Sequence, residues 1–151
     1  MIKIICVGKL KEKFYKDGVE EYLKRISKYT KIELIEVQDI NNNNKDIILE
    51  QEKELILSKI KAKEYIITME IEGNQLSSIE LSKKIDNILL TSSNITFIIG
   101  GSYGLHEEVK KLSNFKLSFS KLTFPHQLFR IMLLEQIYRS YKILNNETYH
   151  K

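Results

Sequence analysis

Residues 98–104 read IIGGSYG, and residues 118–127 read SFSKLTFPHQ. In each stretch a short apolar strand runs into a flexible polar segment, and Pro125 then marks the first turn of a helix. Open α/β sheets bind ligands in the crevice beyond the carboxyl ends of neighbouring strands. The two stretches therefore predict an α/β sheet with a ligand pocket formed by its last two loops.

Strand and helix patterns alternate along the whole chain. Strands are predicted at residues 2–7, 31–37, 65–69, 95–99 and 116–119, and several of these segments are continuous apolar runs. Such runs are typical of strands that helices cover on both faces. Helical segments of ordinary length separate the runs, and this alternation favours βαβ units. We therefore expect an α/β fold with a mainly parallel sheet.

Four helices are predicted between and after these strands. The first has apolar or aromatic residues three or four positions apart, namely Tyr15, Val19, Tyr22, Ile26 and Tyr29. A second helix covers about residues 46–61. The third opens with Ser77 and Glu80 in a capping-box pattern, and the fourth begins at Pro125. No internal repeat or linker is apparent, so we expect one domain over residues 1–151.

Composition limits the class of protein. The chain has 151 residues, of which 42% are hydrophobic, enough for one domain with a sizeable core. No apolar run reaches the roughly 18 residues that cross a bilayer, and residues 1–7 resemble a first strand more than a signal peptide. The single cysteine, Cys6, is expected to be a small core residue. These features predict a cytoplasmic protein that does not bind a membrane.

Charge is distributed unevenly. The net charge of the chain is +4, but residues 110–151 carry eight basic and two acidic side chains, a net charge of +6. A basic segment beside a candidate pocket suits a polyanion such as RNA. A solvated basic helix face would have the same composition, so charge alone leaves both interpretations open.

The glycine segment differs from the familiar nucleotide-binding loops. The chain contains no G-x-x-x-x-G-K-[ST] motif, which excludes P-loop hydrolysis of ATP or GTP. Gly100, Gly101 and Gly104 follow the fourth predicted strand, and no acidic residue stands about 20 positions later to hold a ribose. Glycine would let the backbone approach a flat ligand closely, although a tight structural turn would use the same residues.

Metal and nucleophile motifs are absent from the sequence. His106, His126 and His150 are far apart, and no Cys-x-x-Cys or His-x-x-x-His motif accompanies them. Ser102 lies in GSYG, which is not the G-x-S-x-G motif of a nucleophile elbow. We therefore expect no metal cofactor and no serine nucleophile.

The start of the last helix carries two side chains of chemical interest. His126 and Arg130 are four residues apart and share one face of this helix. They would present a titratable group and a fixed cation to the preceding loop, or they would simply be surface residues. An apolar stripe follows, which indicates either core or a partner surface and comprises Ile131, Leu134, Ile137, Tyr138 and Tyr141.

Taken together, these stretches closely resemble the large-subunit ribosomal RNA methyltransferase H family, which are SPOUT-class pseudouridine N3-methyltransferases. The resemblance covers essentially the whole chain. The motifs that carry it are VGKL at 7–10, TMEIEG at 68–73, FIIGGSYGL at 97–105, LSFSKLTFPHQL at 117–128, EQIYR at 135–139 and YHK at 149–151.

The resemblance implies a fold, a cofactor and a dimer. The C-terminal part would pass through a loop to form a trefoil knot, and the knot would bind S-adenosylmethionine. By position, the family's cofactor-binding residues fall on Met69, Gly100, Phe119, Ser120, Lys121, Leu122, Thr123 and Phe124. Many relatives have Leu where Met69 stands, which is a volume-conserving difference. Two protomers would pair as a homodimer to complete the site.

The resemblance also implies a reaction and a partner. The family methylates N3 of a pseudouridine in 23S ribosomal RNA and prefers the assembled ribosome. The pseudouridine N3–H must lose its proton, which calls for a base and for a cation that stabilises the developing anion. The candidates are His126, Arg130, Tyr149 and His150, and the sequence does not single out the base.

Two other functions remain open at this point. A non-catalytic ribosome- or RNA-binding protein would use the same basic segment, with the glycine loop as a structural turn. A flavodoxin-like sensor of small molecules is the third possibility. Neither alternative requires S-adenosylmethionine.

Overall fold

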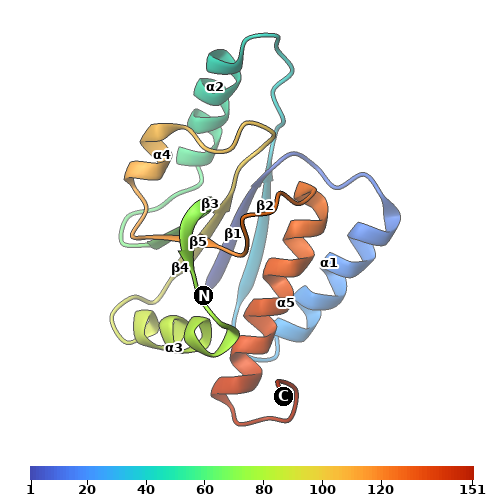
Figure 1. The fold of residues 1–151 in the computed structure, drawn as a ribbon, viewed down its shortest axis with the longest axis vertical. Helices are drawn as coiled ribbons and strands as arrows, with labels where there is room; N and C mark the ends of the chain where they lie inside the picture. The colour runs from blue at the N-terminus through green and yellow to red at the C-terminus, as the bar shows by residue number, and fades with distance from the viewer.

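The computed structural model describes residues 1–151 and contains five strands that alternate with five helices (Figure 1). The strands are β1 (Ile2–Val7), β2 (Ile32–Val37), β3 (Tyr65–Gln75), β4 (Ile95–Ile99) and β5 (Phe115–Ser118). The helices are α1 (Lys13–Ile26), α2 (Lys45–Leu57), α3 (Ser78–Leu89), α4 (Glu107–Lys111) and α5 (His126–Leu144). All five predicted strands and all four predicted helices are present.

The strands form one sheet in the order β2-β1-β4-β3-β5, and every neighbouring pair is parallel. Ile2 of β1 pairs with Ile32 of β2 on one side and with Ile95 of β4 on the other. This register aligns the carboxyl ends of β1, β2 and β4 at one edge of the sheet. The prediction of a mainly parallel sheet is confirmed.

Helices cover both faces of the sheet. One face packs against α1, α3 and α5 through a cluster of 17 buried apolar residues, which includes Ile2, Ile4 and Cys6 of β1. The other face packs against α2 and α4 through a cluster of eight, which includes Ile5 and Val7. Both faces of β1 are therefore buried, which explains why its sequence is apolar except for Lys3, whose buried ammonium pairs with Glu64. None of the five helices combines the length and the apolar character of a membrane span.

The expected core position of Cys6 is confirmed. The side chain is fully buried in the larger cluster and forms no disulfide. Burial raises the pKa of the Cys6 thiol to about 12. The thiolate is therefore negligible at neutral pH, and Cys6 acts as a small apolar residue.

The structure differs from the prediction in three places. Helix α4 was not predicted, because its five residues are too few to show a helical period; the His106 Nδ1 caps it by accepting the Glu108 N–H at 3.0 Å. Helix α2 ends at Leu57 instead of residue 61, and Ser58 forms its C-cap. Strand β3 continues to Gln75, six residues beyond its predicted end at Met69.

Two predicted helix starts are close to the observed ones. The Ser77 hydroxyl accepts the Glu80 N–H at 3.1 Å and caps α3 as expected. Pro125 occupies the N-cap position, so α5 begins one residue later, at His126. The chain thus enters α5 with its direction fixed by the proline ring.

Arg130 attaches the first turns of α5 to the carboxyl end of β1. Its side chain is 1% exposed, and its Nη2 donates to the carbonyls of Val7 at 3.0 Å and Gly8 at 2.8 Å. Its Nη1 donates to Glu36 Oε2 at 2.8 Å, which adds the end of β2 to the contact. A single cation therefore joins α5, β1 and β2.

We expect Arg130→Ala to destabilise the fold by about 3 kcal/mol, because it leaves buried acceptors unpaired and opens a cavity. Urea unfolding followed by circular dichroism measures this loss. Arg25→Ala is the matched control, since Arg25 forms a solvent-exposed pair with Glu21 one turn away on α1 and its loss should change stability little. Equal stability of the two variants would contradict the structural role of Arg130.

Candidate active site

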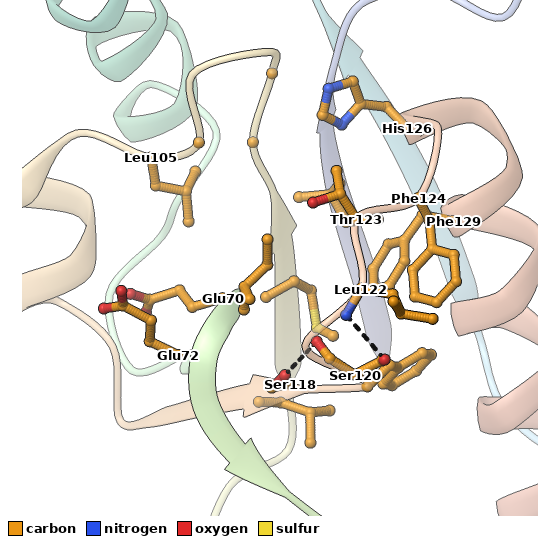
Figure 2. A pocket seen from close by; sticks show the side chains of 18 of the residues that line it. Glu70, Glu72, Leu105, Ser118, Ser120, Leu122, Thr123, Phe124, His126 and Phe129 are labelled. Carbon is orange, nitrogen blue, oxygen red and sulfur yellow. Dashed lines mark hydrogen bonds between the residues drawn. The ribbon is translucent and has the colours of Figure 1, made fainter.

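A cavity of about 410 Å³ lies beside the middle of β3, beyond the carboxyl ends of β4 and β5 and next to the start of α5 (Figure 2). Three segments build its walls, namely residues from 69–72, 99–105 and 117–124, and further lining comes from Lys110, His126 and Phe129. The volume suits a ligand of cofactor size. Nine of the 20 lining residues are hydrophobic, and the others are glycines or carry polar side chains.

The glycine segment forms a tight turn on one side of this cavity. Gly101 and Gly104 are bridged, and Gly104 has a φ of +78°, a conformation that favours glycine. A Cβ atom on Gly100 would lie 2.5 Å from the Gly104 carbonyl oxygen, which is closer than real side chains allow. The turn therefore requires glycine at position 100 and exposes backbone to the cavity.

The segment between β5 and α5 forms the opposite wall. The Leu122 N–H donates to Ser120 Oγ at 3.0 Å, and the Ser118 hydroxyl donates to the Ser120 carbonyl at 3.1 Å (Figure 2). The rings of Phe119 and Phe124 lie 5.1 and 6.3 Å from that of Phe129. Local hydrogen bonds and aromatic packing thus hold this loop against α5.

The cavity brings together most of the residues that the sequence nominated for cofactor binding. The nominated residues that line it are Met69, Gly100, Phe119, Ser120, Leu122, Thr123 and Phe124. Lys121 does not line it, and its side chain is exposed to solvent. The ammonium of Lys121 is therefore free for contacts outside the cavity.

His126 is the nominated catalytic residue that reaches this cavity. Figure 2 shows its imidazole next to Thr123, at the start of α5. Burial, followed by the nearby Arg130 cation, lowers the pKa of His126 from its ordinary value of 6.5. At neutral pH the imidazole is therefore uncharged and able to accept a proton.

Arg130 lies outside the cavity lining. The guanidinium is committed to Glu36 and to the Val7 and Gly8 carbonyls, as described above. Although His126 and Arg130 are one turn apart, only the former reaches the cavity. This geometry indicates that Arg130 holds α5 in position on the sheet.

Tyr149 and His150 follow the end of α5 and fold back onto the middle of this helix. The Tyr149 hydroxyl donates to Glu135 Oε1 at 3.0 Å, and the Arg139 Nη1 lies 3.2 Å from His150 Nδ1. The Arg139 guanidinium also stacks over the Tyr149 ring at 4.7 Å. Burial and the Glu135 carboxylate raise the pKa of Tyr149 to about 12. The tail is therefore docked and its phenol protonated.

The two groups of nominated residues lie apart along α5. His126 stands at the first position of this helix, whereas the tail folds back so that the Tyr149 hydroxyl reaches Glu135, nine residues further along. Nine residues correspond to roughly 14 Å of helix at 1.5 Å per residue. Neither Tyr149 nor His150 is among the residues that line the cavity.

Sequence reasoning did not identify two acidic residues of the lining, Glu70 and Glu72. They follow Met69 at the carboxyl end of the predicted third strand, which is the edge where α/β sheets bind ligands. Their position was the available signal.

Ion pairing reduces the free charge of the basic C-terminal segment. Four of the eight basic residues in 110–151 pair with carboxylates, namely Lys110 with Glu107, Arg130 with Glu36, Arg139 with Glu135 and Lys142 with Glu147. The segment therefore presents fewer free cations than its composition indicates. The remaining four are Lys111, Lys116, Lys121 and Lys151.

Solved structures with a similar fold include one probable methylase and one methyltransferase. A probable methylase family protein from Haemophilus influenzae has a TM-score of 0.58 and 11% identity, with 99% of this chain and 70% of that chain covered. The tRNA (m1G37) methyltransferase from Aquifex aeolicus has a TM-score of 0.51 and 14% identity, with coverage of 91% and 69%. These similarities establish the fold.

Sequence relatives are much closer. Ribosomal RNA large subunit methyltransferase H 1 of Clostridium perfringens is 52% identical, and methyltransferase H of Clostridium botulinum is 54% identical. Each alignment covers 99% of both chains. A family model described as predicted SPOUT methyltransferase matches residues 1–150. The chain therefore belongs to the SPOUT methyltransferases, in the ribosomal RNA large subunit methyltransferase H family.

Proposed function

We propose that this protein uses S-adenosylmethionine to methylate N3 of a pseudouridine in 23S ribosomal RNA of the assembled ribosome. One observation carries the proposal: seven of the eight residues nominated for cofactor binding, together with His126, line one cofactor-sized cavity. Identity of 52% over nearly the whole length to proteins named methyltransferase H supports it. In this proposal the chain acts as one domain, in a cytoplasmic homodimer.

The lining of the cavity fits S-adenosylmethionine. Apolar side chains of Met69, Leu105 and Phe119 offer surfaces for the adenine ring, and the turn at Gly100 leaves its backbone open to a ligand. When bound, the cofactor supplies an activated sulfonium methyl group. The protein would mainly hold the acceptor nitrogen in line with that methyl group.

We also propose that residues 119–125 complete the trefoil knot of this family. This segment leaves β5 and enters α5, whose Arg130 is bonded to the end of β1. Because β3 and β4 separate β5 from β1 in the sheet, the segment crosses the carboxyl ends of both strands. A crossing of this kind is what a knotted C-terminus requires.

Catalytic roles follow from these placements. His126 is our candidate for the base that accepts the N3 proton, because it lines the cavity and is neutral at pH 7. We assign Arg130 a positioning role, since its guanidinium holds α5 on the sheet. Tyr149 and His150 are proposed to handle the substrate in the site of the partner protomer.

The homodimer explains how the tail would reach a cavity. Large apolar side chains remain exposed around the start of α5 and on α1, including Leu122 at 69%, Phe14 at 66% and Leu128 at 38%. A two-fold axis through this surface would bury the patch against its own copy. The tail of one chain would approach the cavity of the other if the two copies of α5 run antiparallel across this axis.

The ribosome is proposed to contact the free lysines. Lys111, Lys116, Lys121 and Lys151 have no carboxylate partner among the ion pairs of this chain. Lysines that are not paired with carboxylates can neutralise phosphates and release counterions from RNA. Lys121 is the most informative of them because it adjoins the cavity lining.

We expect Gly100→Ala to abolish S-adenosylmethionine binding and, with it, labelled methyl transfer to ribosomes that lack the modification. The new Cβ would meet the Gly104 carbonyl oxygen at 2.5 Å, so the turn that forms the cavity wall must move. Calorimetry measures binding, and circular dichroism checks the fold.

Gly18→Ala is the control for this experiment. It makes the same change on α1, where the added carbon meets the flexible end of Ile131, and it should bind normally. Normal cofactor affinity in the folded Gly100→Ala variant would show that the glycine turn is not part of the cofactor site. Failure of the wild-type protein to bind the cofactor would contradict the proposed function itself.

We expect the rate of methyl transfer to fall at acidic pH with a midpoint below 6.5, because burial lowers the pKa of His126 and only its neutral form accepts a proton. His126→Asn should remove this acid limb and lower the plateau by about 100-fold. His106→Asn serves as control, because Asn keeps the cap on α4. An unchanged acid limb in His126→Asn would assign the base to another group.

A further inference from the structure

Strand β3 contains an irregularity where it passes the cavity. Met69 and Asn74 both pair with Leu117 of β5, so residues 70–73 are extra on the β3 side. Gly73 lies so close to β5 that a Cβ atom there would be 2.8 Å from the Lys116 carbonyl carbon. Bulges of this kind redirect side chains and are frequent next to active sites. Here the bulge places Glu70 and Glu72 in the cavity lining (Figure 2).

Glu70 is held in a defined orientation. The fully buried Thr68 hydroxyl donates to Glu70 Oε2 at 2.6 Å and lies 2.7 Å from Ser113 Oγ. This hydrogen bond holds Oε2 in place. The other carboxylate oxygen, Oε1, remains available to accept a hydrogen bond from a ligand. Figure 2 shows Glu70 and Glu72 side by side on the same wall of the cavity.

Negative charge in the lining exceeds positive charge. Glu70 and Glu72 form no ion pair within the chain, and Lys110 is the one lysine or arginine of the lining. The Lys110 ammonium is 3.5 Å from Glu107, a residue outside the lining. His126 is neutral at pH 7 because burial lowers its pKa. The lining therefore carries two carboxylates against one ammonium, a net negative charge.

We propose that Glu70 and Glu72 make this cavity select the positively charged methyl donor over its neutral by-product. The inference rests on the proposed function, since it concerns the same cavity. S-adenosylmethionine carries one net positive charge at pH 7, whereas S-adenosylhomocysteine, which has lost the sulfonium charge with the methyl group, is neutral. A negative wall stabilises the first more than the second. Spent cofactor would thus be exchanged readily for fresh donor.

A different role for the same carboxylates makes a different prediction. Hydrogen bonds from Glu70 or Glu72 to ribose hydroxyls would be common to donor and by-product. Removing such bonds would weaken both ligands by the same factor. The ratio of the two dissociation constants therefore separates charge selection from simple hydrogen bonding.

The test is calorimetric titration of wild type, Glu70→Gln, Glu72→Gln and the double variant. The ligands are S-adenosylmethionine, S-adenosylhomocysteine and sinefungin, an analogue with an amine that keeps the positive charge. Each substitution should reduce the preference for the two cationic ligands by roughly fivefold, the size of one charge contact at 4 Å in water. Gln retains an acceptor for the Thr68 hydroxyl, so the bulge should be preserved.

Glu33→Gln is the matched control. It removes one negative charge from an exposed position on edge strand β2, which three strand pairings separate from β3 in the sheet order, and it should leave the preference unchanged. Glu72 is itself exposed, so its variant gives an answer even where Glu70→Gln is unstable.

An unchanged preference in variants that still bind both ligands would overturn charge selection and leave the proposed function intact. Equal affinity of the wild-type protein for donor and by-product would overturn it as well. Failure of the wild-type protein to bind any of the three ligands would overturn the proposed function together with this inference.

Discussion

The buried guanidinium of Arg130 fixes the geometry on which the rest of the site depends. It joins the first turns of α5 to the Val7 and Gly8 carbonyls at the end of β1, and to Glu36 at the end of β2. Helix α5 nevertheless follows β5, which lies at the opposite side of the sheet. The connecting residues 119–125 must therefore cross the carboxyl edge of the sheet, and this crossing supplies one wall of the cavity.

The middle of α5 holds the C-terminal tail. Glu135 and Arg139 of this helix contact Tyr149 and His150, which fold back from the end of the helix. Neither tail residue lines the cavity that the start of the helix adjoins. In the proposed function, which uses both the cavity and the tail for one reaction, the tail comes from a second copy. The exposed apolar surface at Phe14, Leu122 and Leu128 is where that copy would bind.

Much of the fold could be predicted from local sequence, because strands that are buried on both faces of the sheet have mostly apolar residues. Strands β1 and β4 are apolar except for Lys3 and Thr96, and the glycine turn after β4 was located correctly. Helix α4 was missed because five residues show no periodicity. The continuation of β3 was missed because the bulge replaces the apolar pattern with Glu70 and Glu72, which face the cavity.

The candidate site was predictable in its location but not in the role of each residue. The spacing of His126 and Arg130 correctly indicated a shared helix face, yet spacing carries no information on what that face contacts. The carbonyls of Val7 and Gly8 that hold Arg130 come from more than 120 residues earlier in the chain. The docking of Tyr149 on Glu135 likewise depends on tertiary geometry. The net charge of residues 110–151 overstated the number of free cations on the surface, because a count of charges does not reveal ion pairs such as Arg139 with Glu135.

The central claim is that cavity and tail from two different chains form each working site. Mixing a chain that lacks residues 149–151 with a Gly100→Ala chain tests it most directly, because each is expected to be inactive alone. Labelled methyl transfer to ribosomes lacking the modification is then measured after subunit exchange. The account predicts that activity returns, from mixed dimers that combine one intact cavity with the other chain's intact tail. Confirmed subunit exchange without any return of activity would contradict it.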